Sequence, residues 1–437
     1  MNMKTKLLAT LAFASCAATL FGTATDVPVV SDVTFDQPGG GRTVTVTYNL
    51  QYAPAIVTVD VLTNGVSIGA DKVTHLEGDV GKVVQPGARQ FKWFAKRDWP
   101  EQLITDSIVS VKLRAWALTE PPPYMVADLE TPSNVTYYAS VDALPDGGLS
   151  NRLYKAARLV MRRIDAAGVR WNMGSHKTET GFVWADREAI HTAQLTNDYY
   201  IGIYPLTRGQ FKKVIGWAPR ITDAPSGADD EVYSVQSVAF SEMRQVAPAY
   251  MTSGSDINAS VDRAYDYPAS PAPNSFLGKI STLTGVAFDL PGECEWEYAC
   301  RAGNYCGYWG DGSRILASTG NDANLSRLAN YCLTSGNTGV VHQVGIYAPN
   351  AWGLYDMHGN LWEFCLDIFT ANITGLNGAI NTTVNSDSTN EFGNLHTDRG
   401  GARHKEAKYC RSGNRDRDPD SRRLQHCGFR LVSRIAQ

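Results

Sequence analysis

The sequence lacks several features that would define its class at once. After Phe21, no segment has the roughly 18 uninterrupted apolar residues that a membrane-spanning helix requires, so no transmembrane segment is predicted. Charged residues make up only 19% of the 437 and the formal net charge is −4, which argues against nucleic acid as a partner. No paired CxxC, nucleotide-binding glycine loop, zinc-protease helix or nucleophile elbow occurs, so the sites that these motifs mark are not predicted.

The composition indicates a large, loop-rich globular protein. Aromatic residues make up 10% of the chain, with 10 tryptophans, and there are 39 glycines and 20 prolines. Such a composition supports a substantial core connected by many turns rather than a helical or disordered chain. The length is too great for one ordinary domain and predicts two or three.

The first residues are predicted to be an export signal. Lys4 and Lys6 precede an apolar stretch that ends at Phe21, and small residues follow it, so residues 1–24 are interpreted as a signal peptide. The mature protein is then expected to be secreted, periplasmic or held at the cell surface. Attachment through a lipidated Cys16 is the alternative.

Export also changes what the cysteines can do, because disulfides form in oxidising compartments. After cleavage an odd number of cysteines remains, which leaves at least one free thiol or one intermolecular bridge. They are Cys294, Cys300, Cys306, Cys332, Cys365, Cys410 and Cys427.

Residues 27–120 are predicted to form a small β-sandwich of the immunoglobulin or fibronectin type. Thr43–Tyr48 and Val109–Arg114 alternate with period two, and the Asn64-Gly65 pair suits a tight hairpin. Three tryptophans are expected in its core, with a binding face as the alternative: Trp93, Trp99 and Trp116.

A linker is predicted at residues 121–150, and a large domain at residues 151–437. The linker begins with Pro121–Pro123, and consecutive prolines favour an extended backbone. Within the large domain a helix is expected on which Glu293, Glu297 and Arg301 share one face.

Five ordered runs in the large domain together point to a family. They are Trp171–Gly174, Tyr199–Thr207, Leu290–Gly303, Asn350–Phe364, and the C-terminal signature Arg399–Ser412 with Cys427–Val432. In order and spacing they resemble the formylglycine-generating enzyme family, the sulfatase-modifying factors. The resemblance implies an α+β fold that is irregular, loop-rich and related to C-type lectins.

The loop from Asp356 to Glu363 offers two carboxylates around a glycine, and hard cations take oxygen ligands from loops of this kind. The resemblance implies a calcium site with side-chain ligands Asp356 and Glu363 and carbonyl ligands Gly359 and Leu361. The alternative is that Asp356 caps a turn and Glu363 pairs with an arginine. His358, inside this loop, is expected to be a packed or surface residue rather than a ligand.

The resemblance implies a second calcium site upstream. Its candidate ligands are Asn330, Tyr331 and Asn337, and Asn324 competes for the first of these roles.

In the catalytic members of the family, two cysteines hold Cu+ and leave a position where a substrate cysteine binds. Cys410 matches the second copper cysteine, whereas Lys405 stands at the first, and a strongly hydrated lysine is a poor Cu+ ligand. Ala402 and Glu406 replace a serine and a histidine of that pocket, and Tyr409 is retained. Formylglycine-generating activity is therefore not expected, and Cys410 and Tyr409 are the remaining candidates for catalysis.

Cys410 is expected instead to form a disulfide with Cys300 or Cys427, which would stabilise the domain by about 2–4 kcal/mol. The alternative is a metal site with a single thiolate, to which His404 or His426 could contribute. No cluster of three ligands suited to a non-haem iron centre is visible in the sequence.

The C-terminal region from Arg399 to Arg430 is locally basic, with aspartates interleaved. Mixed signs predict an internal Arg–Asp network, with a groove for an anion or a glycan as the alternative.

Two functions follow from these patterns. The first is an exported, calcium-supported binding or scaffold protein with a protein or glycan ligand. The alternative is an active oxidase that converts a sulfatase cysteine to formylglycine and uses Cu+.

Overall fold

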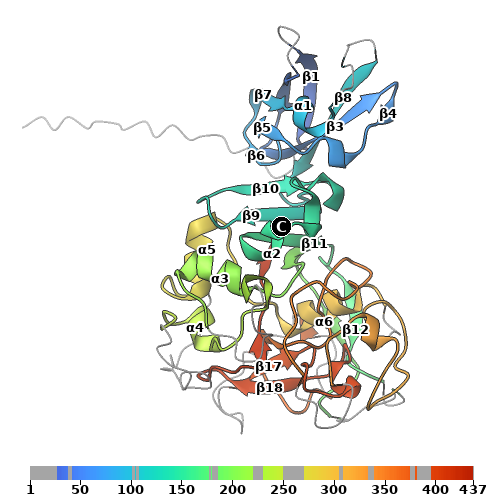
Figure 1. The fold of residues 1–437 in the computed structure, drawn as a ribbon, viewed down its shortest axis with the longest axis vertical. Coiled ribbons are helices and arrows are strands. Elements are labelled where there is room, and N and C mark those ends of the chain that lie inside the picture. Colours follow the sequence, from blue (N-terminus) through green and yellow to red (C-terminus); the bar gives the residue numbers. More distant parts are fainter. Residues whose placement is uncertain are drawn as a thin grey trace, which may run out of the picture.

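The computed structural model describes most of the chain beyond the predicted signal peptide. The described residues are 27–37, 42–100, 104, 108–176, 179, 186–219, 230–249, 270–304, 309–332, 339–374, 379–380 and 395–436. The predicted signal peptide, Cys16, Cys306 and Asn337 lie outside them. Figure 1 shows a β-rich N-terminal unit in blue and a larger mixed unit in green to red.

The N-terminal unit consists of two sheets that share one core. One has the order β1-β2-β7-β5, and the other has β4-β3-β6 with β8 also paired to β3. The strands are β1 Val29–Asp36, β2 Val44–Gln51, β3 Ala55–Thr63, β4 Val66–Ser67, β5 Leu76–Gly78, β6 Val83–Val84, β7 Gly87–Trp93 and β8 Val109–Ala117, with the short helix α1 at Ala95–Asp98. Alternate residues of β2 are buried against β3, as a period of two requires. That this unit is immunoglobulin-like or fibronectin-like stays a prediction.

The three tryptophans of this unit differ in their surroundings. Trp93 is buried and stacks on Trp99, with ring centroids 6.5 Å apart. Trp116 is partly exposed, and the Arg114 guanidinium lies 3.5 Å above its ring. Trp93 and Trp99 therefore belong to the core, whereas Trp116 lies at its edge.

The structure differs from the prediction at residues 121–150. This segment contains β9 (Tyr124–Asp128) and β10 (Val135–Tyr138), which join the sheet β10-β9-β11-β14-β20 of the larger unit. The other strands of this sheet are β11 Arg158–Ile164, β14 Tyr199–Gly202 and β20 Val432–Arg434. Met125, Val126 and Ala127 are buried, and their burial explains why most of the segment folds instead of acting as a linker.

The central sheet is covered on both faces. Met125 and Ala127 of β9 belong to one apolar cluster, whereas Val126 belongs to the other. Successive residues of a strand point to opposite faces, so the two clusters are the two layers that flank this sheet.

The rest of the larger unit has short elements and long loops, which confirms the predicted α+β, loop-rich class related to C-type lectins. One sheet is β12-β13-β16 and another is β18-β17-β15-β19. Their strands are β12 Arg170–Met173, β13 His191–Gln194, β15 Trp362–Ile368, β16 Ala379–Ile380, β17 Leu395–Arg399, β18 Asp416–Pro419 and β19 Cys427–Gly428. The helices are α2 Leu153–Ala156, α3 Arg208–Ile215, α4 Phe240–Arg244, α5 Phe276–Thr284 and α6 Glu293–Arg301. Among the described residues, we find no helix with the length and apolar content needed to cross a lipid bilayer.

Candidate functional site

Helix α6 carries the charged face that its sequence predicted. Glu297 accepts hydrogen bonds from Arg301 (2.7 Å) and Arg399 (2.6 Å), and Glu293 accepts one from Arg399 (2.7 Å) and is paired with Arg415. Burial alone would raise the pKa of Glu297, but Arg301 and Arg399 lower it to about 2. These buried acids are therefore permanent anions that fix α6 against β17 and the C-terminal loops.

The C-terminal arginines do form an internal network, but its buried anions are mainly glutamates from distant segments rather than the neighbouring aspartates. The pairs are Arg399 with Glu293 and Glu297, Arg411 with Glu188, Arg415 with Glu293, Arg423 with Glu242, and Arg430 with Glu363. A glutamate on another element lets the pair tie two segments together, which an aspartate one or two residues away cannot do. Guanidinium groups engaged in this way are not available to an anion groove.

The predicted first calcium loop uses its two carboxylates in different ways. Glu363 accepts hydrogen bonds from Trp296 Nε1 (2.7 Å) and from Arg430 Nε and Nη2 (2.6 and 2.7 Å), which is the arginine pairing that the sequence left open. Asp356 is buried, accepts a hydrogen bond from the Gly345 N–H (2.7 Å), and has its pKa raised to about 6 by burial. The loop therefore provides only part of a cation site. Among the described residues Asp356 has no arginine partner and could bind the cation, whereas Glu363 would have to be shared with Arg430.

The two loops predicted to bind calcium lie side by side. Gly359 forms a bridge with Asn330, and the Asn360 N–H donates to the Asn330 carbonyl (2.7 Å). Gly359 has φ 71°, and a Cβ there would lie 2.2 Å from the Asn330 oxygen, so the contact requires glycine. The Tyr331 hydroxyl accepts from the Asp322 N–H (2.7 Å). Calcium at either loop stays a prediction.

His358 is a packed residue, as expected. It is buried, and its Nε2 accepts a hydrogen bond from the Gly310 N–H (2.9 Å), so its Nδ1 is the nitrogen that donates to the Cys410 carbonyl (2.8 Å). Burial lowers the pKa of His358 to about 4, so the ring is neutral and braces the Cys410 segment.

Cys410 occupies a closed pocket beneath the Gly-Gly turn. Gly401 has φ 77°, and a Cβ at that position would lie 2.6 Å from the Cys410 Sγ, so the glycine makes room for the thiol. Burial raises the pKa of Cys410 to about 12, against opposing hydrogen bonds from the Ala402 and Gly359 backbone. Lys405 lies beside Tyr409, with its Nζ 5.6 Å from the ring centre. Lys405 therefore does not provide the first of the two thiolates that the resemblance implies for Cu+, and Cys410 is the one matched cysteine in this pocket.

The predicted disulfide is not present, because Cys300, Cys410 and Cys427 are free thiols. Each points to different neighbours. The Cys300 Sγ lies 3.5 Å from the Ser412 Oγ, and the Cys427 Sγ lies 3.0 Å from an Asp418 oxygen.

Sequence spacing did not reveal Cys332 as a neighbour of this pocket. Its backbone N–H donates to the Lys405 carbonyl (2.9 Å), and its thiol is close enough to influence the pKa of Cys410. Only the fold brings this cysteine next to the position where the family has the first copper ligand.

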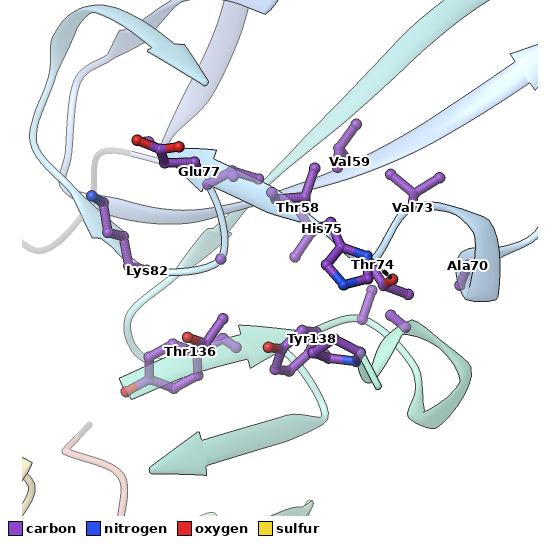
Figure 2. A pocket seen from close by; sticks show the side chains of 18 of the residues that line it. Thr58, Val59, Ala70, Val73, Thr74, His75, Glu77, Lys82, Thr136 and Tyr138 are labelled. Carbon is purple, nitrogen blue, oxygen red and sulfur yellow. Dashed lines mark hydrogen bonds between the residues drawn. The ribbon is translucent and has the colours of Figure 1, made fainter. Parts of the chain in front are cut away.

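A separate cavity of about 720 Å³ lies where the N-terminal unit meets β10. Figure 2 shows His75 and Thr58 of the N-terminal unit on one side and Thr136 and Tyr138 of β10 on the other. The junction is closed by a hydrogen bond from the Tyr137 N–H to the Gly81 carbonyl (2.6 Å). The size is that of a small-molecule site, and the lining mixes hydroxyl, imidazole and apolar groups.

Comparison with known proteins agrees with the geometry of the larger unit. The family model of the sulfatase-modifying factor enzyme 1-like domain matches residues 163–435. The chain belongs to the sulfatase-modifying factor family. It is similar to the formylglycine-generating enzyme of Bos taurus, with 24% identity over 201 residues that cover 42% of this chain and 53% of that protein. The enzyme of Thermomonospora curvata is 30% identical over 124 residues, which cover 24% of this chain and 36% of that one.

This family member thus spans about half the length of the curated relatives it matches, or less. The chain also matches solved structures, among them PvdO from Pseudomonas aeruginosa (21% identity, TM-score 0.46, 63% of this chain and 95% of that one). Another is Treponema denticola variable protein 1 (25% identity, TM-score 0.44, 64% and 96%).

Proposed function

We propose that this protein is an exported binding protein that uses the sulfatase-modifying factor fold without its oxidase chemistry. The observation that carries the proposal is the state of the copper position: Lys405 replaces one cysteine, and the other, Cys410, is a buried neutral thiol. Around this pocket the scaffold is intact, since the Gly-Gly turn, α6 and its arginine partners are all in place.

The cavity at the junction of the two units supports a binding role. His75 and Tyr138 offer a polar ring and an aromatic ring, and Glu77 and Lys82 add charges of opposite sign. Rings combined with hydrogen-bonding groups suit a glycan or a polar segment of a protein.

Binding can be tested with purified mature protein on a glycan array and in pull-downs of surface proteins. We expect a partner whose retention falls in His75→Ala and Tyr138→Ala but persists in Tyr52→Ala, a control at an exposed position of the N-terminal unit. Failure to retain any glycan or protein, with and without calcium, would contradict the proposal.

The calcium part of the proposal is tested separately. A divalent cation at the first loop would offset the buried Asp356 carboxylate, so Ca2+ should raise the melting temperature of the wild type. The shift should disappear in Asp356→Asn and persist in Asp142→Asn, a control with an exposed side chain. An equal shift in both variants would mean that Ca2+ acts elsewhere.

The oxidase remains the second candidate because Cys332 lies next to Lys405 and could supply the missing thiol. The deciding measurement is mass spectrometry of a sulfatase-motif peptide after incubation with protein loaded with Cu+. We expect the peptide cysteine to stay unmodified. Its conversion to formylglycine, lost in Cys332→Ser, would replace the binding proposal with the oxidase.

A further inference from the structure

The C-terminal sheet gathers a second set of metal-ligating side chains, in a different core cluster from Cys410. Asp398 lies on β17, Asp418 on β18 and Cys427 on β19, with His426 just before it. Their spacing in sequence follows no local metal-binding pattern, so the sequence did not reveal them as a cluster.

The geometry of the set is compact. One Asp418 oxygen lies 3.0 Å from the Cys427 Sγ and 3.1 Å from the His426 Nε2, and these three ligand atoms all lie within 4.8 Å of one another. An oxygen of Asp398 lies 3.9 Å from the same sulfur. In a tetrahedral site with metal–ligand bonds of about 2.0–2.3 Å, neighbouring ligand atoms are about 3.3–3.7 Å apart, so small side-chain rotations are enough.

The carboxylates of the set lack an arginine or lysine partner among the described residues. Within the described part of the chain, no arginine or lysine forms an ion pair with Asp398 or Asp418, whose partners are each other, His426 and Cys427. Asp398 is completely buried, and its Oδ1 has no hydrogen-bond partner. A buried carboxylate with an unsatisfied oxygen is costly unless a cation or proton accompanies it.

We propose that Asp418, His426 and Cys427, with Asp398 as the fourth ligand, bind a Zn2+ ion. Thiolate, imidazole and carboxylate are the three ligand types that proteins use for zinc. The side chains of His426 and Asp418 are 31% and 20% exposed, whereas Cys427 and Asp398 are buried, so the ion enters from the histidine side. Once bound, it joins β17, β18 and β19.

The test is zinc titration of the full chain after removal of metal with a chelator. We expect one Zn2+ per chain, by calorimetry and elemental analysis, and a thiolate-to-metal charge-transfer band when Co2+ replaces zinc. Affinity should fall by about tenfold or more in Cys427→Ser and in His426→Ala. It should be unchanged in Cys410→Ser and Cys294→Ser, which alter buried thiols outside the site.

His426→Ala changes a partly exposed side chain, so it keeps the test valid if Cys427→Ser does not fold. Absence of stoichiometric zinc binding, or wild-type affinity in both site variants, would overturn the proposal. Loss of zinc binding in Cys410→Ser alone would overturn it as well, because the ion would then belong to the other pocket. Glycan or protein binding is a separate measurement, so either proposal can fail alone.

Discussion

Asp398 and Arg399 are neighbours on β17, and both are completely buried. Arg399 reaches Glu293 and Glu297 of α6, where every charge has a partner of opposite sign. Asp398, on the opposite face of the strand, meets Asp418 and Cys427, and among the described residues no arginine or lysine forms an ion pair with these aspartates. The same strand therefore separates a balanced network from an unbalanced cluster.

The contrast indicates different roles for the two faces. A balanced buried network is strongly destabilised when one member is removed, because the others lose their partner. An unbalanced cluster gains stability when a cation arrives, because that cation supplies the missing charge.

The largest expected effect is on the balanced face. Arg399→Met would leave Glu293 and Glu297 short of a partner and should lower the free energy of unfolding by about 3–5 kcal/mol, measured by urea denaturation. The matched control Arg422→Met, at an exposed arginine, should change it by less than about 0.5 kcal/mol. Equal effects of the two substitutions would mean that Glu293 and Glu297 do not depend on Arg399 for their charge balance.

On the unbalanced face, zinc should stabilise the protein. At a free concentration 100 times the dissociation constant, a single site that binds only the folded state adds about 2.7 kcal/mol. The melting temperature should therefore rise on addition of Zn2+ to the wild type and rise clearly less in His426→Ala, in which a site tenfold weaker would add about 1.4 kcal/mol or less at the same concentration. A rise of the same size in that variant would show that another site is responsible.

Asp367 is a buried carboxyl near Glu293 that, unlike Glu293, forms no ion pair with an arginine among the described residues. The stability of the protein should therefore depend on the charge of Asp367, and pH changes that charge. Burial and the charge of Glu293 raise the pKa of Asp367 from 3.8 to about 8. A raised carboxyl pKa favours folding at low pH, and this contribution is lost as the pH rises from 3.8 to about 8.

Asp367→Asn should therefore be more stable than the wild type by about 1–2 kcal/mol near the upper end of this range and similar to it at the lower end. Asparagine can still accept the hydrogen bond from the Glu293 N–H (2.5 Å). Thermal unfolding across this pH range checks the trend, and a difference that does not depend on pH would contradict it.

The smallest effect on stability is expected at Lys405. Lys405→Cys changes a partly buried residue and should alter the free energy of unfolding by less than about 0.5 kcal/mol. It nevertheless places a thiol at the position of the missing copper cysteine, so Cu+ uptake should increase, measured by competition with a Cu+ chelator. No gain in Cu+ affinity would show that Lys405 is not what prevents copper binding.

Local features of this fold were predictable from sequence. The spacing of Glu293, Glu297 and Arg301 predicted one face of α6, and the Asn64-Gly65 pair predicted the tight hairpin between β3 and β4. These depend on neighbours a few residues apart.

Contacts between residues far apart in the sequence were not predictable in the same way. The glutamate partners of the arginines come from segments far along the chain, and so does the meeting of Asp398 with Cys427. The free thiols of Cys300 and Cys410 likewise depend on which backbone and hydroxyl groups surround each sulfur, and composition cannot specify these.

The pairing of β14 with β20 also constrains how the domain is made. Tyr199 lies opposite Arg434, so a strand formed early in synthesis remains without this partner until nearly all of the domain has been translated. Closing so long a loop is entropically costly, and contacts of this kind form slowly. The order in which residues leave the ribosome therefore differs from the order in which the central sheet can be completed, and the domain closes only late.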